Sequence, residues 1–225
     1  MLNVRHLTPG PSWDYEAVVC DVAPSDGSVL DMGTGGGEML ARLRGGLPEH
    51  VVATEAWHVN APIAYGRLRP LGVDVVRTRN LRFPFRDASF DIVINRHEEL
   101  MPSEVARVLR PRGRFVTQQV ARPQLWELRR FFPRMRDFGD QRWEYARGFE
   151  ATGLVVTVDR QHDYKVAYGS LGDLVFLLCV TPWSIPDFDV EHDLEALLAV
   201  EREYGTDDGI VVTESRYLLV AEKPG

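Results

Sequence analysis

The sequence VLDMGTGGGEML, which begins at residue 29, places an acid on either side of a glycine-rich turn. Asp31 precedes the turn, Gly33, Gly35 and Gly37 alternate through it, and Glu38 follows it. Glycines let a ligand approach the backbone closely, as they do in loops that bind phosphate. Two flanking carboxylates would repel a pyrophosphate and attract a ligand that carries positive charge. These residue types at this spacing therefore predict a binding site for a cationic ligand.

Two common phosphate-binding motifs do not match this turn. The dinucleotide-binding pattern G-x-G-x-x-G requires a third glycine at the position that Glu38 occupies here. The P-loop pattern requires Lys followed by Ser or Thr after the glycines, and the sequence has neither there. A nicotinamide-dependent oxidoreductase and a P-loop nucleotidase are accordingly disfavoured.

Short apolar runs alternate with helical stretches over the first 120 residues, and this pattern positions the turn. Strands are expected at residues 28–33, 50–55, 73–78, 89–95 and 113–120, with helices at 37–44, 60–72 and 102–110. Such alternation predicts right-handed βαβ crossovers and a doubly wound, mostly parallel sheet with helices on both faces. The glycine turn follows the first strand, at the carboxyl edge where ligands bind in open α/β sheets.

The pattern changes after residue 120. We expect a helical region to about residue 151, which includes an amphipathic helix over 127–138, then a long strand over 154–168, an apolar helix or strand from 173, a helix over 190–205 and a final strand over 209–223. The two long strands predict an antiparallel pair at one edge, which completes a seven-stranded sheet. A single domain is predicted, with an N-terminal helical segment (1–27), a core (28–120) and a C-terminal half (121–225) whose excursion at about 171–205 lies on the substrate side.

Composition limits the classes of partner. The net charge of −7 argues against nonspecific binding to nucleic acid, which requires a basic face. No apolar run approaches the roughly 18 residues of a membrane span, and the N-terminus lacks the pattern of a signal peptide. Cys20 and Cys179 are far apart and are expected to be reduced, and no metal site is predicted. We therefore expect a cytoplasmic protein, either a monomer or a homodimer.

Three segments resemble one known family. The spacing D-x-G-x-G-x-G resembles the first motif of class I S-adenosylmethionine-dependent methyltransferases, which have a Rossmann-like fold. LRFPFRDASFDIVINRH (81–97) resembles the segment that leads into the family's fourth strand, and EVARVLRPRGRFV (104–116) resembles the turn before its fifth. The resemblance covers about residues 28–120, and VTPWSIPDF is similar to the tail of a largely uncharacterised bacterial branch. It implies S-adenosylmethionine as the cofactor and a small molecule as the methyl acceptor.

The resemblance also assigns residues to the cofactor. Glu55, which ends the second strand, would accept hydrogen bonds from both ribose hydroxyls, while the glycine turn would hold the methionine part. Arg79 stands where the family usually has the acid that contacts adenine, which leaves Asn80 or a backbone group to do so; Asn80 could also simply cap a loop. The complete set expected at the cofactor is Asp31, Gly33, Thr34, Gly35, Gly37, Glu55, Ala56, Trp57, Asn80, Leu81, Asn95 and Arg96.

Methyl transfer from a sulfonium is an in-line displacement, which mainly requires alignment and desolvation of the nucleophile. A base is needed only when the acceptor starts protonated. His97 is the candidate base, although a hydrogen-bonded or substrate-positioning histidine fits the sequence equally well. The candidate acceptor contacts, each of which could instead be structural, are Trp13, Tyr15, Gln118, Gln119, Trp143 and Trp183. Two alternatives stay open: a methyltransferase acting on RNA or protein, and a non-catalytic S-adenosylmethionine-binding protein.

Overall fold

A computed structural model describes residues 2–78 and 82–225, and it divides the chain into two compact units. The loop unit consists of Trp13–Gln119, Arg142–Arg160 and Tyr217–Gly225. The β1 unit consists of Met1–Ser12, Val120–Gln141 and Gln161–Arg216. The expected organisation as one domain stays a prediction. Two residues predicted at the cofactor, Asn80 and Leu81, lie outside the described residues.

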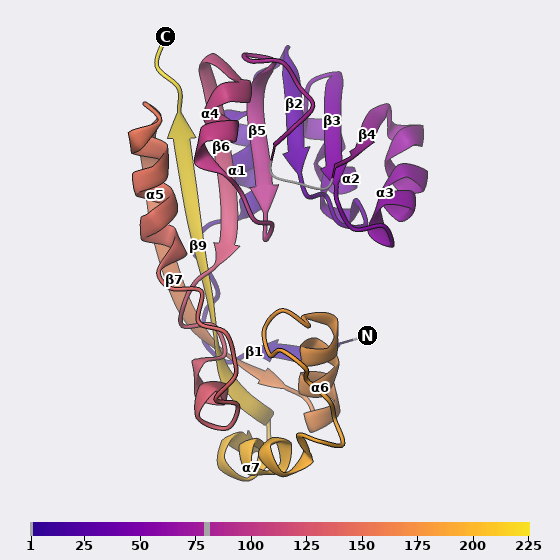
Figure 1. Cartoon of the computed structure of the whole chain (residues 1–225), viewed down its shortest axis with the longest axis vertical. Helices are drawn as coiled ribbons and strands as arrows, with labels where there is room; N and C mark the ends of the chain where they lie inside the picture. Colours follow the sequence, from indigo (N-terminus) through magenta and orange to yellow (C-terminus); the bar gives the residue numbers. More distant parts are fainter. Residues whose placement is uncertain (1, 79–81) are drawn as a thin grey trace. The chain divides into compact units, whose positions relative to one another are not determined.

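The loop unit contains the alternating elements that the sequence predicts (Figure 1). Its elements are α1 (Tyr15–Val22), β2 (Ser28–Met32), α2 (Glu38–Leu43), β3 (His50–Glu55), α3 (Asn60–Leu68), β4 (Val73–Arg77), β5 (Phe90–Arg96), α4 (Pro102–Val108), β6 (Leu109–Val120), α5 (Gln141–Ala151), the first part of β7 (Val155–Tyr168) and the last part of β9 (Gly209–Glu222). Short 3-10 turns at Arg44–Gly46 and Arg69–Leu71 follow α2 and α3.

The sheet of the loop unit has the order β7-β9-β6-β5-β2-β3-β4. Strands β6, β5, β2, β3 and β4 are parallel to their neighbours. Strand β9 runs antiparallel to β6, as the opposite arrows in Figure 1 show, and backbone hydrogen bonds join Arg112 to Lys223 (2.8 Å) and Lys223 to Gly113 (2.9 Å). The chain leaves β2 toward β3 and returns on its other side as β5, so the strand order reverses beside the glycine turn. Ligands bind at such a point in open α/β sheets.

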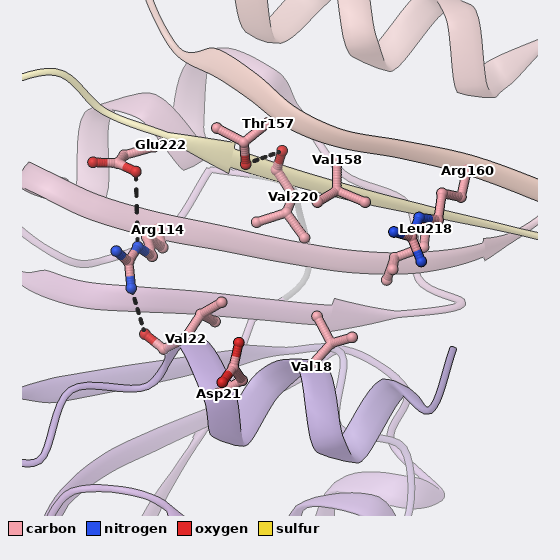
Figure 2. Close-up of a pocket in the computed structure, with 10 residues that line it drawn as sticks. All are labelled: Val18, Asp21, Val22, Arg114, Thr157, Val158, Arg160, Leu218, Val220 and Glu222. Atoms are coloured by element: carbon pink, nitrogen blue, oxygen red, sulfur yellow. Dashed lines mark hydrogen bonds and ion pairs between the residues drawn. The ribbon is translucent and has the colours of Figure 1, made fainter. Parts of the chain in front are cut away.

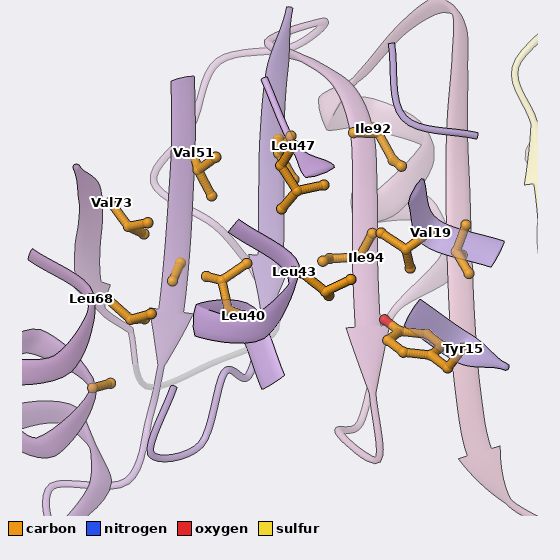
Figure 3. Close-up of a cluster of buried hydrophobic side chains, with 14 of the residues drawn as sticks. Tyr15, Val19, Leu40, Leu43, Leu47, Val51, Leu68, Val73, Ile92 and Ile94 are labelled. Atoms are coloured by element: carbon orange, nitrogen blue, oxygen red, sulfur yellow. The ribbon is translucent and has the colours of Figure 1, made fainter. Parts of the chain in front are cut away.

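Alternating side chains place helices on both faces of this sheet. Val29, Ile92 and Val116 belong to one buried cluster together with residues of α1, α2 and α3 (Figure 3). Phe115, the neighbour of Val116, points to the other face and packs against Phe149 of α5, with ring centroids 5.0 Å apart. Because successive residues of a strand face opposite sides, both faces of the sheet are covered by helices. The predicted fold is confirmed: a mostly parallel, Rossmann-like α/β sheet with antiparallel edge strands.

The β1 unit adds two short strands, so the described residues form nine strands where seven were predicted. Its elements are β1 (Val4–His6), a 3-10 turn (Trp126–Arg130), α6 (Leu171–Val180), α7 (Leu194–Tyr204), β8 (Gly205–Thr206) and the remaining parts of β7 and β9. Strand β1 pairs antiparallel with the end of β7, and β8 pairs with the start of β9. A separate apolar core, which includes Phe132, Tyr168, Leu174 and Leu197, holds this unit together.

The N-terminal segment, expected to be helical, contains the helix α1, and strand β1 precedes that helix. One expectation about a helix was wrong. The amphipathic helix expected over 127–138 is only the 3-10 turn Trp126–Arg130. Leu125 precedes it with a left-handed φ of 49°, and Pro133 cannot donate the backbone hydrogen bond that a continuing helix needs.

No helix among the described residues is long and apolar enough to cross a membrane. In the same part of the chain, no group of three or more His, Cys, Asp or Glu side chains is arranged to hold a metal ion.

Candidate functional site

The glycine turn between β2 and α2 requires glycine for its backbone conformation. Gly33, Gly35 and Gly37 all have left-handed φ angles, of 69°, 62° and 81°. Side chains disfavour this conformation, which explains the alternating spacing of the motif. A Cβ atom at Gly37 would also stand 2.9 Å from Cγ of Leu68 in α3, whereas nothing lies within 4 Å of one at Gly35. The middle of the turn is therefore open to the close approach of a ligand.

Strand β3 holds this turn from the neighbouring strand end. The Gly33 N–H donates to Oγ1 of Thr54 (3.2 Å), and the Gly35 N–H donates to Oε2 of Glu55 (2.7 Å). The other oxygen of Glu55 accepts from the Trp57 N–H at 2.8 Å. Glu55 is 6% exposed, and a carboxylate has about four acceptor positions, so two remain for further donors. The turn and Glu55 thus lie together, as the sequence predicts.

Asp31 is the penultimate residue of β2, two positions before Gly33, and is 7% exposed. Burial, opposed by a hydrogen bond with the Thr34 side chain and assisted by the nearby Glu55 carboxylate, raises the pKa of its carboxyl to about 6. Removal from water disfavours the charged form of an acid, and a second negative charge adds to that effect. Asp31 is therefore a carboxyl whose ionisation a positive neighbour would favour.

Glu98 is the acid at the turn that sequence reasoning missed. Its side chain lies directly over Gly33, so a Cβ atom at Gly33 would collide with it. Burial raises the pKa of Glu98 to about 7, with further contributions from Glu55 and Glu99. His97, with a left-handed φ of 61°, immediately precedes Glu98 at the end of β5. The sequence offers only the adjacent pair of acids in NRHEE (95–99) as a signal, and nothing in that pattern places Glu98 over Gly33.

Glu38 behaves differently from Glu98. It forms an ion pair with Arg67 of α3, whose guanidinium also donates to the Gly36 carbonyl. The Glu38 side chain is 60% exposed. The sequence predicts two acids at the turn, Asp31 and Glu38. Glu38 already has a cationic partner, and Glu98 is the acid that lies at the turn beside Asp31.

Asn95 and Gln119 form a buried polar network under the segment that carries His97 and Glu98. Asn95 is fully buried, and its Oδ1 accepts from Oγ1 of Thr117 (2.9 Å) and from Nε2 of Gln119. Nε2 of Gln119 also donates to the Glu98 carbonyl at 2.8 Å. These contacts show both amides holding the end of β5 in place. Their roles at the cofactor and the acceptor stay predictions.

Two predicted acceptor residues contact each other on the opposite side of β6. Nε1 of Trp13 donates to Oε1 of Gln118 at 2.9 Å, and Gln118 is 8% exposed. Gln118 and Gln119 have separate partners, as expected for neighbouring residues on a strand. Tyr15 is 5% exposed and donates its hydroxyl to the Asn95 carbonyl at 3.1 Å. The structure thus brings Trp13 and Gln118 together, while Tyr15 is held in the core.

The remaining predicted residues lie on the surface, and their roles stay predictions. Ala56 and Trp57 are exposed just after Glu55, as are Arg96 and His97 at the end of β5, and Thr34 is half-buried within the turn. Trp143 on α5 is exposed, with the Arg147 guanidinium 4.7 Å from its ring centroid. Trp183, also exposed, belongs to the β1 unit.

Residues 83–107 contain a second set of acids with an arginine partner. Glu104 of α4 accepts from Nε and Nη2 of Arg107, both at 2.8 Å, and from the Phe83 N–H at 3.0 Å. Arg107 also donates to Asp87 and to the Phe85 carbonyl. The hydrogen bonds from Arg107 hold the pKa of Glu104 below its ordinary value. This arrangement joins the two segments that resemble the family, before β5 and in α4, through Glu104 and Arg107.

A pocket of about 360 Å³ lies elsewhere in the loop unit, between α1 and strands β6, β7 and β9 (Figure 2). Val18, Leu218 and Val220 supply apolar lining, and Arg114 at its rim lies 3.8 Å from Glu222. None of the described residues predicted at the cofactor lines this pocket, so it is separate from the glycine turn.

Comparison with protein families identifies the segment that carries the site. Residues 30–117 match a family model described as a methyltransferase domain. This match begins in β2 and ends in β6, so it includes the glycine turn, Glu55 and Glu98. Among proteins of curated function, none matches the chain.

Solved structures share the fold at low identity. A putative methyltransferase from Bacillus halodurans has a TM-score of 0.70 and 17% identity, with 93% of this chain and 99% of that one covered. The [4+2]-cyclase SpnF has a TM-score of 0.59 and 18% identity, over 93% and 83%. Geranyl diphosphate C-methyltransferase from Streptomyces coelicolor, in complex with Mg²⁺, geranyl diphosphate and S-adenosyl-L-homocysteine, has a TM-score of 0.57 and 20% identity, over 93% and 77%. At these identities the likeness shows the fold.

Proposed function

We propose that the protein, whose residues 30–117 match a methyltransferase domain, is a class I methyltransferase that transfers a methyl group from S-adenosylmethionine to a small-molecule acceptor. We expect it to act in the cytoplasm, as a monomer or a homodimer. The observation that carries this proposal is the combination of an open glycine turn with buried acids that have raised pKa values.

The residues present fit this cofactor. The open space at Gly35 admits a ligand against the backbone, and Glu55 beside it keeps acceptor capacity for two hydroxyl groups. Asp31 and Glu98 supply negative charge for a ligand that carries an ammonium and a sulfonium. The same carboxylates would repel a pyrophosphate, which carries negative charge.

S-adenosylmethionine, when bound, supplies an electrophilic methyl group on a sulfonium. The work left to this chain is to align the acceptor with that group in line and to exclude water. Gln119 and Asn95 hold the end of β5, and therefore the position of His97, through their buried hydrogen bonds. His97 is exposed beside the turn, where an imidazole can remove a proton from an oxygen or nitrogen acceptor near neutral pH.

A small-molecule acceptor is favoured by the charge of the protein. The net charge of −7 disfavours RNA, whose phosphates need a basic face. Geranyl diphosphate C-methyltransferase, which shares the fold, acts on a small molecule. Trp13 and Gln118 offer an aromatic surface and an amide within one hydrogen bond of each other, and we propose them as part of the acceptor pocket.

Calorimetric titration with S-adenosylhomocysteine and with NADH tests the cofactor. We expect the first to bind and the second not to; binding of NADH alone would overturn the proposal. The acceptor class is tested by incubating the protein with methyl-labelled S-adenosylmethionine and a fractionated cell extract. Label in the small-molecule fraction supports the proposal, whereas label in RNA or protein contradicts it. Cofactor binding without any labelled product indicates a non-catalytic role or another reaction, such as that of the cyclase with the same fold.

A further inference from the structure

The carboxyl ends of three adjacent strands bring three acids to the glycine turn. Asp31 comes from β2, Glu55 from β3, and Glu98 follows β5. Glu98 lies over Gly33, and Glu55 is bonded to the N–H of Gly35, only two residues further along. The acids therefore surround the part of the turn that a ligand would contact, and each reaches it from a different strand.

Glu98 has mostly negative charge around its carboxyl. The neighbours that act on it most strongly are Glu55 and Glu99, and both raise its pKa. Asp31 is the acid of the adjacent strand, and burial raises its pKa as well. The basic residues of its own segment, Arg96 and His97, are exposed, and the positive charge of Arg96 acts on Tyr15 of α1. Two uncharged tyrosines also lie near these acids, Tyr15 of α1 near Asp31 and Tyr145 of α5 near Glu98 and Glu99, and burial raises the pKa of both hydroxyls above the ordinary value.

We propose that Glu98 is a proton-linked counter-charge for the cofactor: its carboxyl keeps a proton while the turn is empty and releases it to solvent when a cationic group binds beside Gly33. This inference rests on the proposed function. Glu98 is then the residue through which the site distinguishes a charged ligand from an uncharged one.

The proton balance sets the pH dependence of binding. An empty site with a protonated Glu98 must lose that proton before it can pair with a cation, so the affinity for the cation falls as pH drops below about 7. One coupled proton predicts a decrease of about tenfold between pH 8 and pH 6. S-adenosylhomocysteine lacks the sulfonium charge and keeps only its ammonium, so its binding should release fewer protons.

The experiment measures S-adenosylmethionine and S-adenosylhomocysteine binding by calorimetry from pH 6 to pH 8. Two buffers of different ionisation enthalpy give the number of protons released at each pH. Three proteins are compared: the natural sequence, Glu98→Gln and, as a matched control, Glu99→Gln. Thermal unfolding checks that each variant is folded, and the Glu98 carbonyl that accepts from Gln119 is unchanged by either substitution.

For the natural protein we expect proton release near pH 7 that is larger with S-adenosylmethionine than with S-adenosylhomocysteine. Glu98→Gln should bind S-adenosylmethionine more weakly at pH 8 and show only about a twofold decrease to pH 6, which Asp31 alone would cause. Glu99→Gln should keep the release and shift its midpoint to lower pH, since it removes one negative neighbour of Glu98.

The possible failures are distinguishable. If S-adenosylmethionine binds but Glu98→Gln keeps the pH dependence of the natural protein, Glu98 is not the linked group and the inference is overturned, while the proposed function stands. If neither ligand binds at any pH, the proposed function is overturned together with this inference.

Discussion

Two sets of buried or partly buried acids in the loop unit behave in opposite ways. At residues 83–107, Glu104 is bonded to Arg107, and its pKa is lowered. At the glycine turn, Asp31 and Glu98 have raised pKa values, because burial removes water and their strongest charged neighbours are other carboxylates. An acid paired with a guanidinium thus stabilises the fold. An acid removed from water among other acids destabilises the ligand-free protein, and a cationic ligand can offset that destabilisation.

The largest expected effect is on the free energy of unfolding and concerns the pair of Glu104 with Arg107. Glu104→Ala should lower the free energy of unfolding by about 3 kcal/mol, because it leaves Arg107 and the buried Phe83 N–H without their partner. Urea denaturation measures this. Asp87→Ala is the control, since the Asp87 side chain is 79% exposed and its pair with Arg107 should contribute less than about 1 kcal/mol. Equal losses for the two variants would show that the burial of Glu104 does not matter.

The next largest effect is an increase in the free energy of unfolding, and it concerns Asp31 beside the glycine turn. Asp31→Asn should raise the free energy of unfolding of the ligand-free protein at pH 8 by about 2 kcal/mol. The pKa of Asp31 in the folded protein, about 6, lies above the ordinary value of 3.8. The protonated carboxyl therefore stabilises the folded state fully below pH 4, and this stabilisation is lost as pH rises through 6. Denaturation at pH 4 and pH 8 should therefore show a gain for the variant only at pH 8. A loss at pH 8 would mean that Asp31 stabilises the empty turn.

Glu55→Ala should weaken S-adenosylhomocysteine binding by about tenfold or more, because two charge-assisted hydrogen bonds to the ribose would be lost. Isothermal titration measures the affinity. Glu49→Ala, an exposed acid just before the same strand, serves as the control and should leave the affinity unchanged. An unaltered affinity in Glu55→Ala would place the ribose elsewhere.

The smallest effect is expected for the acid that already has a partner. Glu38→Gln should change the affinity for S-adenosylmethionine by less than about twofold, since Glu38 is 60% exposed and paired with Arg67. A loss as large as that of Glu98→Gln would show that Glu38 faces the ligand and would remove the distinction between paired and unpaired acids.

Features that depend on one continuous stretch could be predicted from the sequence. Alternating apolar runs indicated the strands, and the glycine spacing indicated a turn after β2 that a ligand can approach closely, because both follow from local backbone geometry. Glu55 could be placed at the turn because it ends the next strand, and parallel strands end at the same edge.

Features that depend on tertiary contacts could not be predicted from the sequence. Arg67 neutralises Glu38 across 29 positions, and nothing in either residue's surroundings in the sequence indicates the pair. Glu98 reaches Gly33 because β5 lies beside β2 and because His97 adopts a left-handed conformation, and the sequence around His97 indicates neither. The expected helix over 127–138 failed because a regular apolar pattern was given more weight than Pro133.

The conformation of His97 limits which sequences can carry this site. A left-handed φ at a residue with a side chain costs about 1 kcal/mol, and β-branched residues adopt it least readily. Glycine, asparagine or aspartate would keep the turn, whereas valine or isoleucine would pull Glu98 away from Gly33. Relatives that bind different acceptors could therefore vary widely in the pocket around Trp13, yet they should draw this single position from a short list of residue types.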